Sequence, residues 1–458
     1  MSAVPTREEK DTMGVVRVPE SAHYGAQTRR AADHVLCPEI QLPFGFIRAL
    51  ALIKRSAAAV NRRLGLLEPR LAEAVAAAAE EVMRGHLDDQ FIVGVFQTGS
   101  GTSTNMNANE VIASRANERL TGRKGGRSPV HPNDHVNLGQ SSNDAVPSAI
   151  HIAAAVCLQQ ELIPALQRLH EALAAKALEF ADVRKIGRTH LQDAVPMRLG
   201  QEFSGYARQV ELGIERVRGA AVRLTELALG GTAIGTGVNA HPQFAAETIA
   251  LIARETGIAF REAENHFEAQ GARDAAVETS GALRTVAVSL TKLANDIRWL
   301  GSGPRCGLGE IVIPALQPGS SIMPGKVNPV IPEAVIQAAA QVLGNDATIA
   351  LSGMGGNFEL NTMLPVIAYN LLQSIDLLAA AARTFAEKCV LGIAADRAVC
   401  SEAVEKSLAL ATGLVPRIGY DRAAAVAKRA YDSGKTVRAV LMEEGVLTPE
   451  EIDAALKL

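Results

Sequence analysis

The sequence predicts a mainly α-helical protein with a long central helical bundle. Alanine and leucine are abundant, whereas aromatic residues make up 4% of the 458 residues, and this composition favours helices over strands. Three segments in the middle of the chain place apolar side chains alternately three and four residues apart. That ~3.5-residue period is typical of helices that pack nearly antiparallel along their length. A chain of this length also suggests roughly two to four domains.

The three apolar seams follow one another along the chain. They consist of Leu162, Leu166, Leu169 and Leu173, then Val210, Ile214, Val217, Ala221 and Leu224, then Leu283, Val286, Leu290, Leu293 and Ile297. Helices of roughly 25 to 30 residues would run about 40 Å, longer than most globular helices. Such helices bury their seams on one another, often across subunits, and Pro164 is expected to bend the first of them.

Composition around the bundle predicts three domains. Residues 1–140 mix shorter helices with glycine- and asparagine-rich loops, residues 141–396 hold the bundle, and residues 397–458 form a small helical domain. The last helix is expected to open at Thr448-Pro449-Glu450-Glu451, where an N-cap is followed by Pro at the first helical position and by a capping Glu.

Charge and hydropathy exclude several classes of partner. The formal net charge is −3, which gives no sign of attraction to nucleic acid or to a membrane surface. Residues 1–12 are polar and lack an apolar signal core. The most apolar long segment, 366–382, is interrupted by Asn370, Gln373 and Asp376, which indicates a buried helix. We therefore expect a soluble, cytoplasmic chain.

The cysteines give no metal or disulfide signature. Five are scattered singly, and neither a CxxC nor an HExxH pattern occurs. We expect no metal and no cofactor, and each cysteine is expected to be a small buried apolar side chain. They are Cys37, Cys157, Cys306, Cys389 and Cys400.

The segment 319–329, Gly-Ser-Ser-Ile-Met-Pro-Gly-Lys-Val-Asn-Pro, is the most informative part of the chain. Its glycines and prolines prevent a regular helix or strand. Lys326 and Asn328 can together grip a carboxylate by charge and hydrogen bond. Ile322 and Met323 favour shelter from water, so the loop is expected to close onto something. A polar surface loop is the plain alternative.

Three further polar islands interrupt the helical background, at residues 97–107, 131–144 and 187–193. Each has a plain explanation: residues 142–144 could cap a helix that starts near Val146, residues 101–107 could form a turn, and His190 could be a structural histidine. The glycine-rich segment 230–237 follows no predicted strand and lacks GxGxxG spacing, so a helix–helix turn is favoured over a nucleotide site.

Together the islands supply many neutral donors, one Lys and one His. That inventory suits a small dicarboxylate. It also suits the transition state in which a proton leaves a carbon next to a carboxylate and the charge spreads onto that carboxylate as an aci-carboxylate-like species. The chemistry is that of a carbon–oxygen or carbon–nitrogen lyase.

The 319–329 segment resembles the signature loop of the fumarase/aspartase superfamily, and its Gly-Lys-Val-Asn-Pro form resembles that of class II fumarases. The resemblance spans the chain, from residues 11–14 to the helical tail. It implies a three-domain fold and a homotetramer whose long helices form the central bundle, with each active site shared between three chains. It also implies reversible hydration of fumarate to (S)-malate without metal or cofactor.

The resemblance assigns roles by position. Ser320 is the residue expected to remove the C3 proton of malate, and it would need donors from its own loop to stabilise the alkoxide. His190 is expected to handle the proton of the C2 hydroxyl through a water, with Glu333 pairing with it. The residues expected to bind substrate are Ser100, Gly101, Thr102, Asn105, Ser141, Ser142, Asn143, Thr189, Ser321, Lys326, Val327 and Asn328. A second, peripheral dicarboxylate site would comprise His131, Pro132, Asn133 and Asp134.

Some positions depart from the fumarase pattern and leave alternatives open. Residues 134–139 read Asp-His-Val-Asn-Leu-Gly, and Ser128 stands where the peripheral site usually has an Arg. Residues 330–335 and 23–25 resemble aspartases, so an aspartate ammonia-lyase is the nearest rival. Residues 99–102 and Gly325 favour the hydratase. A catalytically inactive scaffold is the alternative from a different class, and the intact set of candidate residues argues against it.

Overall fold

The structure is a computed structural model, and it describes residues 5–456. Helices account for 63% of the chain, and the strands are short. The chain divides into two compact units built from interleaved segments. Unit 1 comprises residues 1–164, 215–287 and 340–379, and unit 2 comprises residues 165–214, 288–339 and 380–458. The predicted boundaries near residues 140 and 396 stay a prediction.

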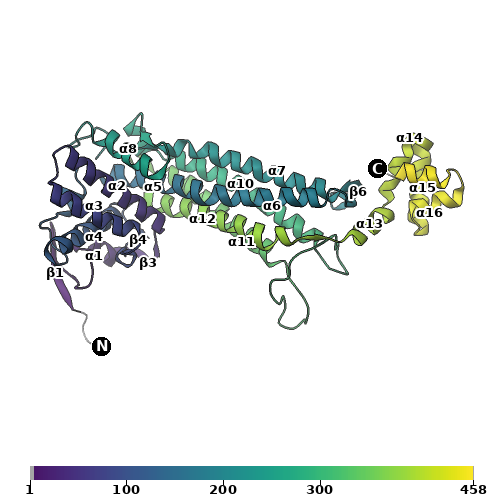
Figure 1. The fold of residues 1–458 in the computed structure, drawn as a ribbon, viewed down its shortest axis with the longest axis horizontal. Helices are drawn as coiled ribbons and strands as arrows, with labels where there is room; N and C mark the ends of the chain where they lie inside the picture. Colours follow the sequence, from purple (N-terminus) through teal and green to yellow (C-terminus); the bar gives the residue numbers. More distant parts are fainter. Residues whose placement is uncertain (1–4, 457–458) are drawn as a thin grey trace. The chain divides into compact units, whose positions relative to one another are not determined.

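Five helices contribute residues to both units. They are α6 (Ile163–Glu179), α7 (Leu199–Ala221), α10 (Asp274–Leu300), α11 (Val330–Gly353) and α12 (Leu364–Lys388). These are the long helices of the bundle (Figure 1). Every residue of the three predicted seams is buried except Ala221, which is half-buried, so the seams are confirmed. Their spacing keeps one apolar stripe turned inward along each helix.

Unit 1 begins with short helices and strand pairs near the N-terminus (Figure 1). Its first elements are β1 (Thr6–Asp11), β2 (Gly14–Pro19), α1 (Ala26–His34), β3 (Leu36–Gln41), α2 (Phe44–Arg63), α3 (Pro69–Met83), η1 (Asp88–Gln90), β4 (Gly94–Phe96), α4 (Thr102–Thr121), η2 (Pro132–Val136), α5 (Ser142–Cys157) and η3 (Leu158–Leu162). Strands β1 and β2 pair antiparallel from Thr6 opposite Pro19 to Asp11 opposite Gly14. Helix α2 packs against α3, α5 and α8 (Phe244–Thr256), which makes it the centre of this unit.

The remaining elements of unit 1 connect the long helices. They are η4 (Arg223–Thr225), β7 (Glu226–Leu227), β8 (Arg261–Glu262), α9 (His266–Gly271), β10 (Gly356–Asn357) and β11 (Leu360–Asn361). Strand β7 pairs parallel with β8 and precedes the glycine-rich segment 230–237, so the expectation that no strand comes before that segment was wrong. A strand of two residues leaves no periodicity for a sequence to show.

Unit 2 contains the hairpin of β5 (Arg184–Thr189) and β6 (Gln192–Arg198), the pair β9 (Ile311–Val312) and β12 (Ala394–Ala395), and a terminal group of helices. The latter are η5 (Val390–Gly392), α13 (Arg397–Lys406), η6 (Leu408–Leu414), α14 (Val415–Ile418), α15 (Tyr420–Ser433), α16 (Val437–Glu444) and α17 (Pro449–Leu456). Residues 404–456 share one hydrophobic cluster. The predicted start of α17 is confirmed, since Thr448 N donates to Glu451 Oε2 and Glu451 N to Thr448 Oγ1.

The predicted bend at Pro164 coincides with an irregular turn. Residues Leu158–Leu162 form a π-helical turn in which Ile163 N donates to the Leu158 carbonyl. A proline cannot donate to the preceding turn, and a local change of helical hydrogen bonding accommodates that loss.

Two helical stretches, Ser142–Glu179 and Leu364–Gly392, are long and apolar enough to cross a membrane by length and composition alone. Of their most apolar windows, 56% and 61% are buried within the folded chain. Core helices of soluble proteins pass the same test, and the second stretch is the one whose sequence predicted a buried helix.

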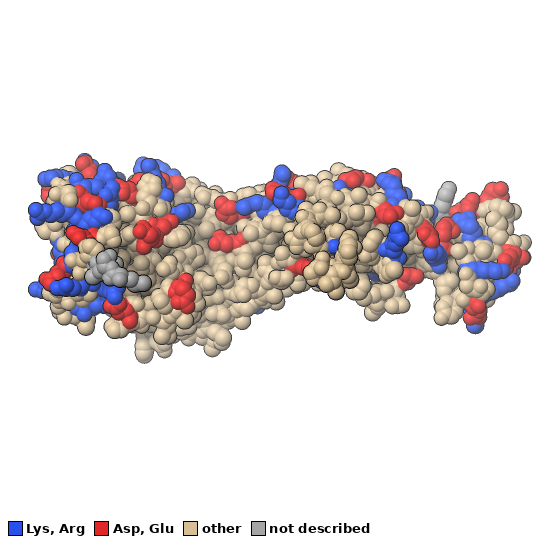
Figure 2. Space-filling view, turned by 90° about the horizontal axis from the view of Figure 1, so that it is seen from below, with Lys and Arg blue, Asp and Glu red and all other residues tan. Residues whose placement is uncertain are grey.

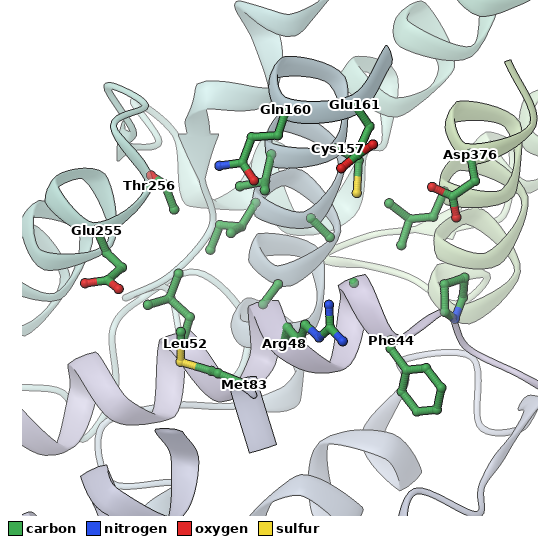
Figure 3. Close-up of a pocket in the computed structure, with 17 residues that line it drawn as sticks. Phe44, Arg48, Leu52, Met83, Cys157, Gln160, Glu161, Glu255, Thr256 and Asp376 are labelled. Carbon is green, nitrogen blue, oxygen red and sulfur yellow. The ribbon is translucent and has the colours of Figure 1, made fainter. Parts of the chain in front are cut away.

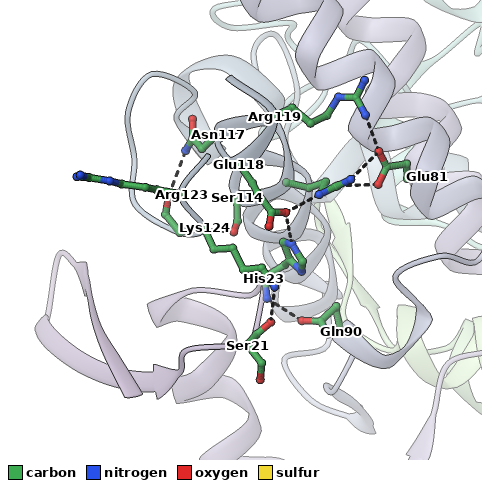
Figure 4. Close-up of polar contacts among 12 residues, drawn as sticks. Ser21, His23, Glu81, Gln90, Ser114, Asn117, Glu118, Arg119, Arg123 and Lys124 are labelled. Carbon is green, nitrogen blue, oxygen red and sulfur yellow. Dashed lines mark hydrogen bonds and ion pairs between the residues drawn. The ribbon is translucent and has the colours of Figure 1, made fainter. Parts of the chain in front are cut away.

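Polar contacts anchor the segment after β2 to helices α3 and α4 (Figure 4). His23 Nε2 lies 2.9 Å from Glu118 Oε2, and the His23 amide donates to Gln90 Oε1 at 2.7 Å. Arg115 joins Glu118 to Glu81. Burial lowers the pKa of His23, while Glu118 opposes that change.

Charged side chains of both signs are intermixed on the face shown in Figure 2, and few of them lie over the long helices there. Helix α11 exposes Leu343 (41%) and Leu351 (70%), and the following loop exposes Met354 and Phe358.

The cysteine prediction was partly wrong. Cys389 and Cys400 are buried as expected, and Cys157 is partly buried, but Cys37 and Cys306 are exposed. Both exposed cysteines lie outside helices, where no apolar face covers them. All five are free thiols. Within residues 5–456, no three His, Cys, Asp or Glu side chains gather as metal ligands would.

Candidate active site

A chain of hydroxyl groups joins the first two polar islands within unit 1. Ser100 Oγ lies 2.7 Å from Thr102 Oγ1, which lies 2.6 Å from Ser142 Oγ. Gly101 is in the left-handed region with φ 71°, and a Cβ there would come within 2.9 Å of Val146. Only glycine therefore allows this turn to bring Ser100 and Thr102 beside Ser142. Residues 102–107 form the start of α4 rather than a turn, which corrects the plain alternative for that island.

The second island is both a helix cap and part of the site. Ser141 is the N-cap of α5 and Asp144 completes its capping box, so the helix begins at Ser142 and not near Val146. The buried Asp144 carboxylate accepts hydrogen bonds from the backbone N–H groups of Ser141 (2.8 Å), Gly230 (3.0 Å) and Thr232 (3.0 Å). Burial raises the pKa of Asp144 to about 6, and these donors oppose the rise. The cap thus fixes Ser141 and Ser142 against the glycine-rich segment.

A cavity of about 360 Å³ opens beside these residues in unit 1. Four of the predicted substrate-binding residues line it, namely Thr102, Asn105, Ser141 and Ser142, and so does Asn133 of the predicted peripheral site. Asn143 instead donates from Nδ2 to the Ala233 carbonyl at 2.8 Å. The cavity offers hydroxyl and amide groups to a ligand. That these residues bind a carboxylate stays a prediction.

The third island is the turn of the β5–β6 hairpin in unit 2. Thr189 pairs with Gln192, and His190 and Leu191 form the turn with φ 57° and 59°. Positive φ is uncommon outside glycine, but a two-residue hairpin turn whose twist matches its strands requires it at both central positions. Thr189 and His190 are exposed.

A buried ion cluster supports this hairpin. Glu310 is 0% exposed, and it accepts two hydrogen bonds from Arg188, at 3.0 and 2.9 Å. Lys185 Nζ, also buried, lies 3.2 Å from Glu310 and donates to Glu202 at 2.7 Å. Because Arg188 directly precedes Thr189, this cluster fixes the strand that presents His190.

Replacing Glu310 by alanine is expected to lower the free energy of unfolding by ~3–5 kcal/mol, because the buried Lys185 and the partly buried Arg188 lose their shared partner. Thermal melting followed by circular dichroism measures the effect. Asp182→Ala is the matched control, since its ion pair with Arg397 is exposed and should shift the melting temperature little. Equal shifts in both variants would contradict a structural role for the buried cluster.

The signature loop folds back on itself in unit 2. Gly319 N donates to the Lys326 carbonyl and Asn328 Nδ2 donates to the Gly319 carbonyl, both at 2.8 Å. A Cβ on Gly319 would approach Asn328 N to 2.7 Å, so this close contact requires glycine. Ile322 is 84% exposed and Met323 49%, and Lys326 and Val327 are exposed. The apolar residues of the loop thus have no shelter within one chain.

Ser320 Oγ accepts hydrogen bonds from two backbone N–H groups of its own loop, those of Ile322 (3.2 Å) and Met323 (2.9 Å). These are the donors that an activated serine oxygen would need. Ser321 is exposed beside it. Glu333 is partly buried in the first turn of α11, where its amide donates to the Pro329 carbonyl at 3.2 Å.

The peripheral island forms a short π-helical turn, η2, in unit 1. His131 is its N-cap, and His131 Nδ1 accepts from the amides of Asn133 and Asp134, both at 3.1 Å. Pro132 is buried, and Asn133 and Asp134 are exposed. Burial lowers the pKa of His131. The histidine therefore has a structural role as a cap, and a second dicarboxylate site there stays a prediction.

The candidate residues fall into separate groups. Unit 1 holds Ser100 to Asn105 and Ser141 to Asn143, and unit 2 holds Thr189, His190, the signature loop and Glu333. The hydrogen bonds and ion pairs described above lie within these units. None of the candidates lines another cavity in unit 1, of about 610 Å³; Arg48, Cys157 and Asp376 are among its lining residues (Figure 3).

Comparison with known proteins decides the family. A family model described as Lyase matches residues 14–344, and one described as Fumarase C C-terminus matches residues 410–458. The class II fumarate hydratase of Mycobacterium tuberculosis (strain H37Rv) is 56% identical over 98% of this chain and 94% of its own length. The corresponding protein of Thermosynechococcus vestitus is 52% identical over 99% and 97%. The chain belongs to the class II fumarase family.

Solved structures agree with this class II fumarase fold. The class II fumarase of Schistosoma mansoni has a TM-score of 0.95 and 41% identity, covering 99% of this chain and 98% of its own. A Brucella melitensis fumarate lyase:delta crystallin, solved with bound cobalt, has a TM-score of 0.92 and 46% identity over 99% and 98%. The mainly α, fumarase/aspartase-like fold is confirmed, and nothing favours the ammonia-lyase over the hydratase.

Sequence reasoning missed several residues that support the site. Asn137 and Gln140 line the unit 1 cavity and Lys54 lies behind them, while Arg188 of the hairpin pairs with the buried Glu310. One signal was available: Lys54 interrupts the buried face of α2, which runs through Leu50, Ile53 and Ala57. A charged residue on such a face needs a partner that folding supplies.

Proposed function

We propose that this class II fumarase catalyses the reversible hydration of fumarate to (S)-malate by acid–base catalysis. The main observation behind this proposal is that Ser320 Oγ accepts hydrogen bonds from two backbone N–H groups within the signature loop. Donors placed in this way stabilise negative charge on the oxygen and so lower the free energy needed to form the serine alkoxide that acts as the base.

In this mechanism Ser320 removes the C3 proton of malate, and the electron pair moves onto the adjacent carboxylate. The resulting aci-carboxylate species carries two negative charges, so its binding wall must supply donors in advance. Lys326 and Asn328 bind it by charge and hydrogen bond. The hydroxyl and amide groups of the substrate-binding set, with Gly101 and Val327 as backbone contacts, complete the wall.

In the direction of fumarate, the electron pair of the aci-carboxylate returns to form the C2–C3 double bond as the C2–O bond breaks, and His190, through a bound water, gives the leaving hydroxyl the proton that makes it water. In the direction of malate, His190 takes a proton from the water that adds to C2. Glu333 pairs with His190 and raises its basicity. The left-handed backbone of His190 and the ion cluster beneath it support this role, because they hold the ring at an exposed turn.

We propose that four chains assemble and that three of them contribute to each site. The unsheltered Ile322 and Met323 support this, as do the exposed apolar residues of α11. The assembly works in the cytoplasm, and it needs neither nucleic acid nor a membrane as a partner.

The test is the loss of fumarate absorbance with purified protein, in buffer alone and with added ammonium, with products separated by chromatography. Malate in both conditions is the expected result. Aspartate formed only with ammonium would identify an ammonia-lyase. If the protein turns over neither fumarate nor malate in either condition, the inactive scaffold is the remaining alternative.

Replacing Lys326 by methionine is expected to raise KM by ~10²-fold, because a substrate carboxylate loses its charged partner in a closed site. Initial rates at several fumarate concentrations measure KM. Lys428→Met, at an exposed lysine paired with Asp432, is the control and should leave KM unchanged. An unchanged KM in both would mean that Lys326 faces solvent in the working enzyme.

Prolonged incubation with a chelator is expected to leave the activity intact, because the proposed steps use only side chains and backbone donors. Rates before and after treatment, and after adding back iron or zinc, provide the check. A loss that iron or zinc restores would contradict the proposed metal-independent mechanism.

A further inference from the structure

The cavity of unit 1 binds an anion in the proposed mechanism, yet its wall is neutral. Thr102, Asn105, Ser141 and Ser142 line it with hydroxyl and amide groups. Among the described residues that line this cavity, none is Lys, Arg or His. Any positive charge that unit 1 contributes to an anion in the cavity therefore comes from behind its wall.

Lys54 lies directly behind this wall, in the middle of α2. Its side chain is 0% exposed. Its ammonium donates to Asn137 Oδ1 and to Gln140 Oε1, both at 2.9 Å. Asn137 and Gln140 both line the cavity, so the charge is one hydrogen bond from the cavity wall.

The two partners of Lys54 connect it to candidate residues. Asn137 Oδ1 also accepts from Asn105 Nδ2 at 3.2 Å, and Asn137 Nδ2 donates to the Gln140 carbonyl at 3.0 Å. Gln140 immediately precedes Ser141. Lys54 is thus linked to two parts of the cavity wall. Through Asn137 it is linked to the amide of Asn105, and through Gln140 to the segment that carries Ser141 and Ser142.

The charge of Lys54 is not taken up by a bridging carboxylate. Asp144 is the acid whose field acts on it, and the Asp144 carboxylate is itself satisfied by three backbone N–H groups. Burial lowers the pKa of Lys54 to about 7, and Asp144 opposes this. A dianion in the cavity would favour the protonated form further, since opposite charges stabilise each other where water is excluded.

We infer that Lys54 is a positioning residue for the substrate: it fixes Asn137 and Gln140, and through them the binding wall, and places a positive charge behind it. The inference rests on the proposed function, because it takes the ligand to be a dicarboxylate. Lys54 does not reach the cavity surface, so its effect is expected in binding and not in proton transfer.

Three variants separate charge from hydrogen bonding. Lys54→Met removes both, Lys54→Gln keeps a donor without the charge, and Lys54→Arg keeps the charge. Lys176→Met is the matched control, because Lys176 is also buried and donates to the Ile393 carbonyl in unit 2. The readouts are KM and kcat for fumarate and malate, and the affinity for succinate by calorimetry on the intact assembly.

We expect Lys54→Met and Lys54→Gln to raise KM and to weaken succinate binding by ~10-fold or more, with kcat within about 3-fold of wild type. Lys54→Arg and Lys176→Met are expected to stay within about 3-fold in both measurements. If Lys54→Met fails to fold, the comparison of Lys54→Gln with Lys54→Arg still tests the inference.

Wild-type KM and succinate affinity in both neutral variants would overturn the inference while leaving the hydratase intact. Equal losses in the Gln and Arg variants would also overturn it, since charge would then not matter. Failure of all three variants to fold would assign Lys54 to stability instead. If the wild-type protein neither hydrates fumarate nor binds succinate, the proposed function fails first.

Discussion

Ser320→Ala is expected to lower kcat by ~10³-fold or more while the chain still folds and assembles. The proposed mechanism has no other group to take the C3 proton, and the alanine removes only one oxygen from an exposed loop. The loop should persist, because its closing hydrogen bonds join Gly319 to Lys326 and Asn328. Steady-state rates with fumarate and malate measure the loss, and size-exclusion chromatography checks assembly.

The control for this variant removes a serine hydroxyl elsewhere. Ser204 lies on the exposed face of α7, and its Oγ donates to the Gln201 carbonyl. Ser204→Ala should leave kcat within about 2-fold of wild type. A Ser320→Ala enzyme with near wild-type kcat would exclude Ser320 as the base, and a different residue would then have to remove the proton.

His190→Asn is expected to lower kcat by ~10²-fold or more, because an amide can hydrogen-bond to the water but cannot exchange a proton with it near neutral pH. The exposed hairpin turn should tolerate the change, since asparagine also adopts the left-handed conformation that His190 has. The measurement is kcat for fumarate and malate over a range of pH, in wild type and variant.

His170→Asn provides the comparison for the second variant. His170 is partly buried on α6, and it is not adjacent in sequence to any candidate residue. Its replacement should leave the dependence of kcat on pH unchanged. If His190→Asn keeps the wild-type rate and profile, the water is activated by another residue and the role assigned to His190 is wrong.

The two variants affect two different proton transfers of one reaction, at C3 for Ser320 and at the C2 hydroxyl for His190. The Ser320 alkoxide is stabilised by backbone donors at 3.2 and 2.9 Å, whereas His190 depends on a ring held at a left-handed hairpin turn and on a partner acid. A combined Ser320→Ala, His190→Asn enzyme should therefore lose little more than the Ser320→Ala enzyme, because residues that serve one reaction path are not additive.

The helical scaffold could be read from local pattern. Apolar residues at three- and four-residue spacing predicted the seams, and those side chains are buried because a helix presents that spacing on one face. The start of α17 followed from Thr448 and Glu451, whose capping bonds join residues three positions apart. Strand β7 could not be predicted from the sequence, because a strand of two residues is too short to show an alternating pattern.

The sequence by itself determined the family, the helical seams and the identity of the candidate side chains, because motif and periodicity are properties of neighbouring residues. Only the tertiary structure decided what supports those side chains. Lys54 meets Asn137 across 83 residues, and Arg188 meets Glu310 across 122. Such pairs carry no local signature, because contacts between distant residues form only when the packed helices bring them together. The exposure of Cys37 and Cys306 was decided at the same level.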